Sequence, residues 1–233
     1  MIEPVRDGVF FHIPDSLPRG RHDLARKEVI AAQRERLMIA LTELMAAKGY
    51  AAVTVGAVAD RAKISRASFY KCFSDQEACA FAAYDRFIEV LLADLQAAGG
   101  GDDWDEIFGS LIRAYLAALQ RDLVVARAFQ VEMDAVGARA RAHRREALVR
   151  FAHYIRAERE RVWTGPGAPA ALPLSAFVGL VYAARQLACD ALDAEQEPDL
   201  LALAPDLTTW MSMVLRSNHA AGERTVARSR ARP

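Results

Sequence analysis

The sequence predicts an all-α protein built in two helical parts. Signals for strands are nearly absent, because no stretch alternates β-branched and polar residues over the length of a strand. Alanine, leucine and arginine, which all favour helices, dominate the composition. The stretch 98-AGGGDD-103 interrupts the helical patterns, since three successive glycines followed by acids are typical of a linker or wide turn. We therefore expect the two parts to meet there.

The composition is that of a globular protein without a strong overall electrostatic field. Of the 233 residues, 53% are hydrophobic and 26% are charged, and 30 basic residues balance 30 acidic ones. Any electrostatic function must therefore come from local patches. Three cysteines are too few for a disulfide framework, and no apolar run approaches the roughly 18 residues of a membrane span. We expect a soluble cytoplasmic protein with no membrane partner and no cofactor.

Both ends of the chain are basic. Residues 1–28 contain the cluster 19-RGRHDLARK-27 and are predicted to form a flexible basic arm, although an ordinary solvated tail explains the pattern equally well. Residues 219–233 are predicted to be a basic, frayed tail.

Four helices are predicted before the glycine-rich stretch, at about 29–48, 55–62, 66–72 and 74–97. Gly49 ends the first helix. Thr54 and Ser65 are the predicted N-caps of the two short helices, because a hydroxyl oxygen can accept from a free N–H of the first turn. The fourth helix opens with a capping box in which Ser74 is the cap and Glu77 follows three residues later.

Longer helices are predicted after the stretch, at about 104–120, 122–135, 137–163, 174–194 and 203–217, with a loop at 165–173. The helix 174–194 is apolar on two faces, which indicates burial on both sides. Pro205 fits only the first turn of the last helix. The two last helices carry more apolar surface than one core requires, which favours a homodimer interface. The alternative is that they form the middle of one large helical core.

The stretch 54-TVGAVADRAKISRASFYKCF-73 pairs two short helices in a helix-turn-helix pattern, whose second helix can enter a DNA major groove. The residues predicted to face inward are Val55, Val58, Ala59, Ala62, Ile64 and Phe69. Those left facing outward on the second helix are Arg66, Ala67, Ser68, Tyr70 and Lys71. Arginine can bond a guanine edge and an alanine methyl can touch thymine, whereas tyrosine and lysine suit phosphates. Helical hairpins are common, so the pattern also fits an ordinary packed helix pair.

Residues 31–91 resemble the DNA-binding domain of the TetR family of transcriptional repressors. The resemblance lies in KGY at 48–50, T-V-x-x-V-A-x-x-A at 54–62 and I-S-R-A-S-F-Y-x-x-F at 64–73. It implies a three-helix DNA-binding domain at 29–97 and a helical ligand-binding and dimerisation domain at 103–218. It also implies a homodimer that binds a palindromic DNA operator and is released by a small-molecule effector. The DNA contacts that it implies are Thr54, Ser65, Arg66, Ala67, Ser68, Tyr70 and Lys71.

Three residues depart from the family pattern. Lys63 stands in the turn where glycine is common, so the turn must suit lysine or accept strain. Cys72 replaces a frequent histidine, and a packed cysteine or a thiol switch could explain it. Gln76 replaces a lysine that commonly contacts a backbone phosphate, so we expect one such contact to be absent unless the basic arm compensates.

Other functional classes receive little support from the sequence. The histidines show no metal-ligand spacing and no nucleophile motif is present, so we expect no enzyme activity and no metal site. A helical interaction module without DNA binding remains an alternative. The effector is expected to be lipophilic or aromatic. Aromatic residues that could line its pocket or belong to the core are Trp104, Phe108, Tyr115, Phe129, Tyr154, Phe177 and Tyr182.

Overall fold

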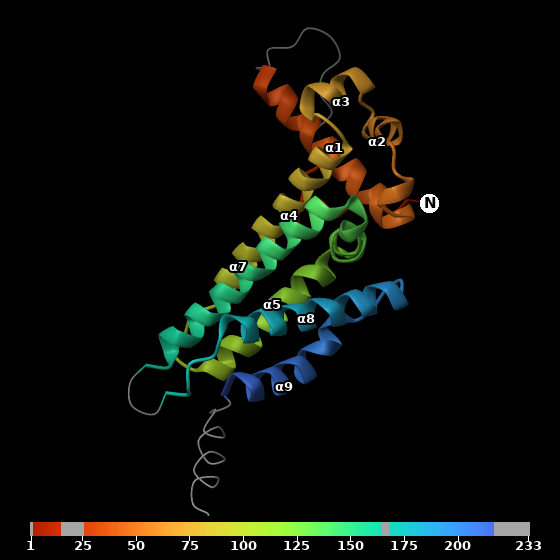
Figure 1. The fold of residues 1–233 in the computed structure, drawn as a ribbon. Helices are drawn as coiled ribbons and strands as arrows, with labels where there is room; N and C mark the ends of the chain where they lie inside the picture. Colours follow the sequence, from red (N-terminus) through yellow and green to blue (C-terminus); the bar gives the residue numbers. More distant parts are fainter. Residues whose placement is uncertain (1, 15–25, 165–167, 217–233) are drawn as a thin grey trace, which may run out of the picture.

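The protein is elongated, with a small helical head at one end and a larger helical body at the other (Figure 1). This computed structural model describes residues 2–14, 26–164 and 168–216. Within those ranges the chain forms helices and one isolated bridge between Asp7 and Phe11, with no strand, so the predicted all-α class is confirmed. The predicted tail at 219–233, and Arg19 and Arg21 of the basic cluster, lie outside the described residues.

The head follows the predicted order of helices. Its elements are α1 (Arg26–Lys48), the 3-10 turn η1 (Tyr50–Ala52), α2 (Val55–Ala62), α3 (Arg66–Cys72) and the start of α4 (Gln76–Ala98). Gly49 ends α1 with a positive φ of 76°, as expected of a glycine stop. The predicted cap of α4 is wrong by one residue, because Asp75 and not Ser74 accepts from Ala78 N, at 2.7 Å. The carboxylate is the stronger acceptor for a free N–H at this positive helix end, and the Ser74 hydroxyl donates to it at 3.1 Å.

The body contains the remaining helices. They are α5 (Trp104–Arg121), α6 (Leu123–Ala126), the π-helical turn η2 (Arg127–Val131), the 3-10 turn η3 (Glu132–Val136), α7 (Ala138–Val162), α8 (Leu174–Ala194), the 3-10 turn η4 (Leu200–Leu203) and α9 (Ala204–Arg216). The single helix predicted at 122–135 is therefore wrong, because the chain passes there from α through π to 3-10 geometry. The predicted bounds of α8 are confirmed, and Pro205 lies in the first turn of α9.

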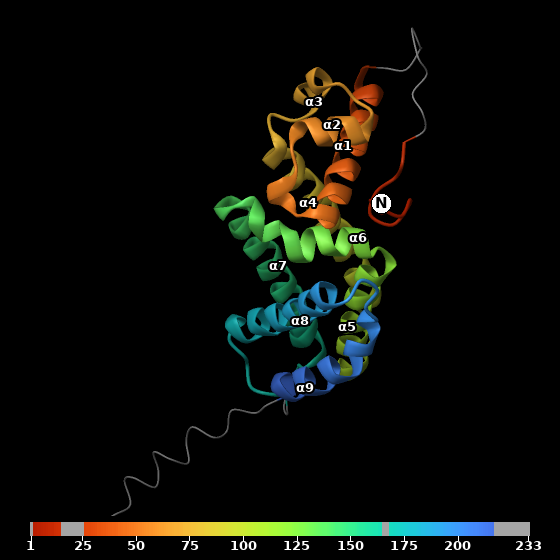
Figure 2. The same ribbon diagram turned by 90° about the vertical axis from the view of Figure 1, so that its right-hand side faces the viewer.

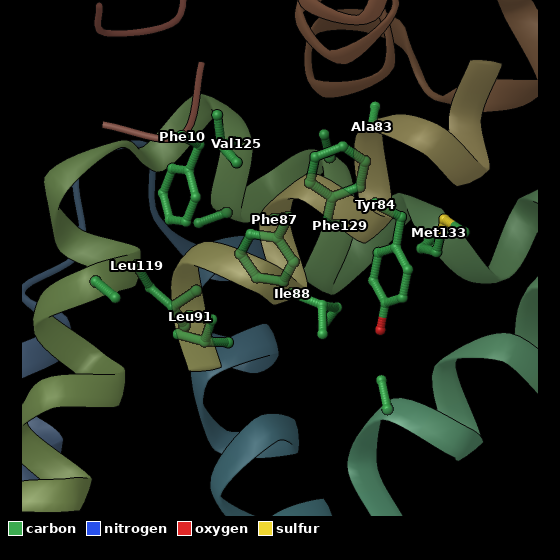
Figure 3. Packing of buried hydrophobic residues seen from close by; sticks show 14 of the residues in the cluster. Phe10, Ala83, Tyr84, Phe87, Ile88, Leu91, Leu119, Val125, Phe129 and Met133 are labelled. Atoms are coloured by element: carbon green, nitrogen blue, oxygen red, sulfur yellow. The ribbon is translucent and has the colours of Figure 1, made fainter. Parts of the chain in front are cut away.

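The N-terminal segment 2–14 is packed against the protein, so the expected flexible arm is wrong for these residues. Phe10 and Phe11 are buried, and the ring of Phe10 lies 5.3 Å from that of Phe87 on α4 (Figure 3). Gly8 N donates to Phe11 O at 2.8 Å, which closes a turn at the Asp7-Gly8 pair. The buried apolar side chains and the turn therefore hold this segment against the protein, although basic residues follow it in the sequence.

Two buried carboxylates hold the N-terminal segment in place. Val5 N donates to Glu43 Oε1 on α1 at 3.1 Å, and Arg6 N donates to Asp122 Oδ2 at 2.7 Å. Asp122 also caps α6 through Val124 N, and burial raises the pKa of its carboxyl above the usual value. The segment therefore joins head and body, as its position beside α1 and α6 also shows (Figure 2).

Helix α4 is shared by the head and the body. Its first turns pack on α1, and its later turns run beside α7 and α5 (Figure 1). Phe87 on α4 and Phe129 on η2 pack ring to ring at 5.4 Å, and Tyr84 contacts the same ring at 5.8 Å (Figure 3). The stretch 98–103 forms the turn from α4 to α5. A movement of α4 would therefore displace residues in both the head and the body.

Candidate nucleic-acid interface and ligand cavity

Local hydrogen bonds fix the turn between α2 and α3. The Thr54 hydroxyl accepts from Ala57 N at 3.2 Å, and the Ser65 hydroxyl accepts from Ser68 N at 3.1 Å, so both predicted caps are confirmed. Lys63 ends α2 in the left-handed conformation, with φ 55° and ψ 43°, and is the one non-glycine residue with positive φ among those described. The chain accepts backbone strain at this position, because left-handed geometry disfavours a Cβ.

The packing of α2 and α3 agrees with the predicted inward and outward faces. Val58, Ala59, Ala62 and Phe69 are buried, while Val55 and Ile64 are half-buried. Thr54, Ser65, Arg66, Ala67, Tyr70 and Lys71 are exposed, and Ser68 is half-buried. The ring of Tyr70 is 59% exposed. All of the residues predicted to contact DNA thus lie at the surface in one short stretch of chain, on the outer side of the head (Figure 1).

Of the four basic residues between positions 61 and 71, three give this face its positive charge. Arg61 Nε bonds Glu43 Oε2 at 2.7 Å, so its charge is neutralised by α1. Lys63, Arg66 and Lys71 form no ion pair within the described residues. The Arg66 guanidinium lies so near Gly56 on α2 that any side chain at position 56 would overlap it. Arg66 therefore has room to rest on α2 because of that glycine.

The environments of Cys72 and Gln76 give each an ordinary structural role. Cys72 is buried, and burial raises the pKa of its thiol, as is typical of a packed cysteine. Its carbonyl accepts from Arg34, whose guanidinium lies 4.1 Å from the ring centre of Phe73. Gln76 hydrogen-bonds the hydroxyl of Tyr50 from the first turn of α4.

The body encloses a narrow cavity of about 60 Å³ between α4, α5, α7 and α8. Its wall is largely hydrocarbon, with α4 contributing Tyr84, Phe87, Ile88, Leu91 and Leu95. Of the aromatic residues considered from the sequence, Phe108, Tyr115 and Tyr154 line this cavity. Phe129 and Phe177 belong to the core, and Trp104 stacks on Phe108 at 5.5 Å.

Besides Tyr84 and Tyr154, three residues with polar groups line the cavity, and two of them, Gln130 and Arg185, were not predicted from the sequence. Arg185 on α8 is 8% exposed, and its Nη2 donates to the backbone oxygen of Gln130 on η2. Gln130 is itself 5% exposed. Tyr115 on α5 completes the group, and burial raises the pKa of its hydroxyl far above the usual range. A lone arginine between apolar residues, as in 178-VGLVYAARQLAC-189, is the signal that could have drawn attention to this site.

The part of the chain that the structure describes offers neither a metal site nor a membrane-spanning helix. No group of histidine, cysteine, aspartate or glutamate residues there could hold a metal ion. His143 instead bonds Asp85 Oδ1 at 2.6 Å. None of the described helices is long and apolar enough to cross a bilayer.

An exposed, basic helix-turn-helix on a helical body is typical of DNA-binding regulators, and comparison with known proteins supports this class of protein. Residues 37–83 match the family described as bacterial regulatory proteins, tetR family. The match confirms the predicted resemblance to the TetR family over these residues, and solved structures of transcriptional regulators, one of them described as TetR-family, share the fold. Members of this family are DNA-binding proteins and not enzymes. No curated protein matches the chain in sequence.

Solved structures share the fold over most of the chain. The fatty acid degradation regulator FadR from Bacillus halodurans is 15% identical, with a TM-score of 0.66 over 77% of this chain and 94% of its own. FadR from Bacillus subtilis, solved in complex with stearoyl-CoA, is 17% identical, with a TM-score of 0.65 over 76% and 96%. A transcriptional regulator from Rhodococcus sp. RHA1 is 25% identical, with a TM-score of 0.62 over 78% and 95%.

Proposed function

We propose that this protein is a repressor that binds a palindromic DNA operator as a homodimer and is released by a small lipophilic effector. The observation that carries the proposal is an exposed surface formed by α3 and the turn before it, whose Lys63, Arg66 and Lys71 form no ion pair with any described residue, on a protein whose body holds an apolar cavity. The cavity lies in the body, which corresponds to the expected effector-binding domain at 103–218 together with the later turns of α4.

The face of α3 divides into two kinds of DNA contact. Arg66 and Ser68 are proposed to contact base edges, with the methyl of Ala67 against thymine. The phosphate contacts are proposed for Thr54, Ser65, Tyr70 and Lys71. Such a division predicts that losing Arg66 relaxes sequence preference, whereas losing Lys71 weakens binding to all sequences and lowers the salt dependence.

The dimer interface is proposed to lie on the outer faces of α8 and α9. Leu187 on α8 is 41% exposed, and Met213 and Val214 on α9 are 61% and 40% exposed. A second copy of the chain would cover these side chains, because burying apolar area favours association. Members of this family typically dimerise, which supports the same assignment.

The proposed mechanism is a shift between two dimer states. Two copies of α3 must stand about 34–36 Å apart to meet successive major grooves. A cavity of about 60 Å³ holds only a few heavy atoms, so a larger effector must push its helices apart. Because α4 lines the cavity and also packs on α1, that movement would reach the head. The stearoyl-CoA bound by the Bacillus subtilis structure favours an effector with an acyl chain.

The proposal is tested with the double variant Arg66→Ala, Tyr70→Ala. Both side chains are exposed, so the variant is expected to keep its helical content and its dimer mass. Binding to an inverted-repeat DNA from upstream of its own gene, measured by fluorescence anisotropy, is expected to fall by at least about 100-fold. Unchanged affinity would contradict the assignment of α3. An effector that binds tightly but leaves operator affinity unchanged would contradict the release mechanism.

A further inference from the structure

The polar cluster in the cavity wall consists of Tyr115, Gln130 and Arg185, which come from α5, η2 and α8. Each belongs to a different part of the sequence, and the fold brings them to one wall that is otherwise apolar. All three residues line the same cavity, and Arg185 donates to the backbone oxygen of Gln130.

Each member of the polar cluster has bonding capacity that the described residues do not satisfy. Arg185 forms no ion pair there, although its side chain is almost fully buried. The Tyr115 hydroxyl and Gln130 Oε1 are buried and have no hydrogen-bond partner there. A buried charge without a counter-charge is costly, and buried polar atoms are normally paired. One buried charge without a counter-charge and two buried polar atoms without partners, all in one cavity wall, indicate that a polar ligand group binds there.

We propose that the polar cluster binds the carboxylate of an amphipathic acid whose hydrocarbon chain occupies the apolar cavity. This inference rests on the proposed role of the cavity as the effector site. The carboxylate supplies the negative charge that Arg185 lacks, and a guanidinium can hold both of its oxygens. The Tyr115 hydroxyl donates to the same group, and the Gln130 amide does so once its nitrogen turns inward.

A charged head group fits this cluster better than a neutral one. An ester, thioester or alcohol could accept one hydrogen bond, but each would leave the Arg185 charge without a counter-charge in an apolar wall. Hydrogen bonds to charged groups contribute about 1.5–3 kcal/mol, which corresponds to roughly a 10- to 100-fold preference for the acid. The apolar wall formed by residues such as Ile88, Leu91 and Leu111 accounts for binding of the chain in either case.

The polar cluster lies close to a contact between body and head. Gln130 is two residues from Glu132, whose Oε2 accepts from Tyr50 N at 3.2 Å at the start of η1. The π-helical turn that carries Gln130 also packs on α1. A π turn inside a helix often marks a functional site. A carboxylate held at Gln130 and Arg185 is thus placed to shift the element that touches the DNA-binding head.

The test compares decanoic acid, methyl decanoate and decanol, titrated into the full-length protein below their micelle concentrations. Binding is measured by isothermal titration calorimetry in the absence of DNA. The wild type is expected to bind the acid at least about 10-fold more tightly than the ester. Arg185→Met should abolish that preference without weakening the ester. Its stability without ligand should be equal or greater, because it removes an unpaired buried charge.

A pair of tyrosine variants provides the matched control. Tyr115→Phe should reduce acid affinity several-fold, whereas Tyr154→Phe should leave the ratio of acid to ester unchanged, because the Tyr154 hydroxyl already donates to Leu95 O at 3.3 Å. Equal affinity of the wild type for acid and ester, or an Arg185→Met protein that keeps the preference, would overturn the carboxylate site. A bound acid that leaves operator affinity unchanged would instead overturn the proposed release mechanism, so the two failures are distinguishable.

Discussion

Replacing Lys63 by glycine is expected to stabilise the protein. Lys63 holds φ 55° and ψ 43° at the end of α2, where a Cβ crowds the backbone. Left-handed geometry costs a residue with a Cβ about 1–2 kcal/mol, and glycine avoids it. Glycine also adds entropy to the unfolded chain, which reduces the gain by about 0.5–1 kcal/mol. The expected net gain in the free energy of unfolding is therefore about 0.5–1 kcal/mol.

A series at position 63 separates backbone strain from side-chain effects. Lys63→Ala removes the ammonium group but keeps the Cβ, so its stability should match the wild type. Lys63→Asn should lie between alanine and glycine, because asparagine tolerates left-handed geometry. Urea unfolding followed by circular dichroism, at one fixed protein concentration, measures the differences. A gain of 1 kcal/mol corresponds to roughly 2–4 °C in Tm for a chain of this size.

The result that refutes this reasoning is a glycine variant no more stable than the alanine variant. The turn would then hold its conformation without strain, and the hydrogen bond from Lys63 N to Asp60 O, at 3.1 Å, would account for its geometry. The affinity of the glycine and alanine variants for operator DNA tests the role of the Lys63 charge separately. Both variants lack the ammonium group, so they should bind DNA equally if Lys63 acts only through its charge.

Three further predictions concern the N-terminal segment and the start of α4. Phe10→Ala should lower the free energy of unfolding by about 3–5 kcal/mol because it empties a buried site, whereas Ile13→Ala, at a position that is 51% exposed, should change little in the same urea assay. Asp75→Ala should cost about 1 kcal/mol at pH 7, and Ser74→Ala much less. The pKa of Asp75 is lowered mainly by its bond from Ala78 N, so its contribution should be present above about pH 4 and decline as the pH falls through the folded value, which a urea series across pH detects. Gln76→Lys should add a phosphate contact and steepen the salt dependence of DNA binding, as measured by anisotropy.

The helix-turn-helix could be predicted closely because its signals are local. Thr54 and Ser65 act within three residues of themselves, and the apolar residues of α2 and α3 repeat at helical spacing. The cap of α4 was harder, because Ser74 and Asp75 are adjacent and both can accept from a free N–H. Which of the two residues caps α4 depends on side-chain charge and rotamer, and the sequence pattern does not specify the rotamer.

The N-terminal segment and the cavity could not be read in the same way. The fate of Phe10 depends on Phe87 and Phe129, which lie far away in the sequence. The Asp7-Gly8 pair indicates a turn, but it does not indicate what the segment packs against. The irregular turn η2 cannot be deduced from residues that are ordinary helix formers. Arg185 can be assigned to the cavity site only when the fold shows that Gln130 is its neighbour. In the second half of the chain, long-range packing decides the site.

Because α4 belongs to both the head and the body, the head of one such protein cannot simply be joined to the body of another. A hybrid that joins a foreign DNA-reading unit at the glycine-rich turn would also import a foreign α4. It would therefore replace five residues of the cavity wall, from Tyr84 to Leu95, and the surface on which Phe10 rests. Exchanging the DNA-reading unit at that joint would therefore also change the binding of the proposed effector. A hybrid designed to keep the native cavity should be joined before Tyr84 and should retain the native N-terminal segment.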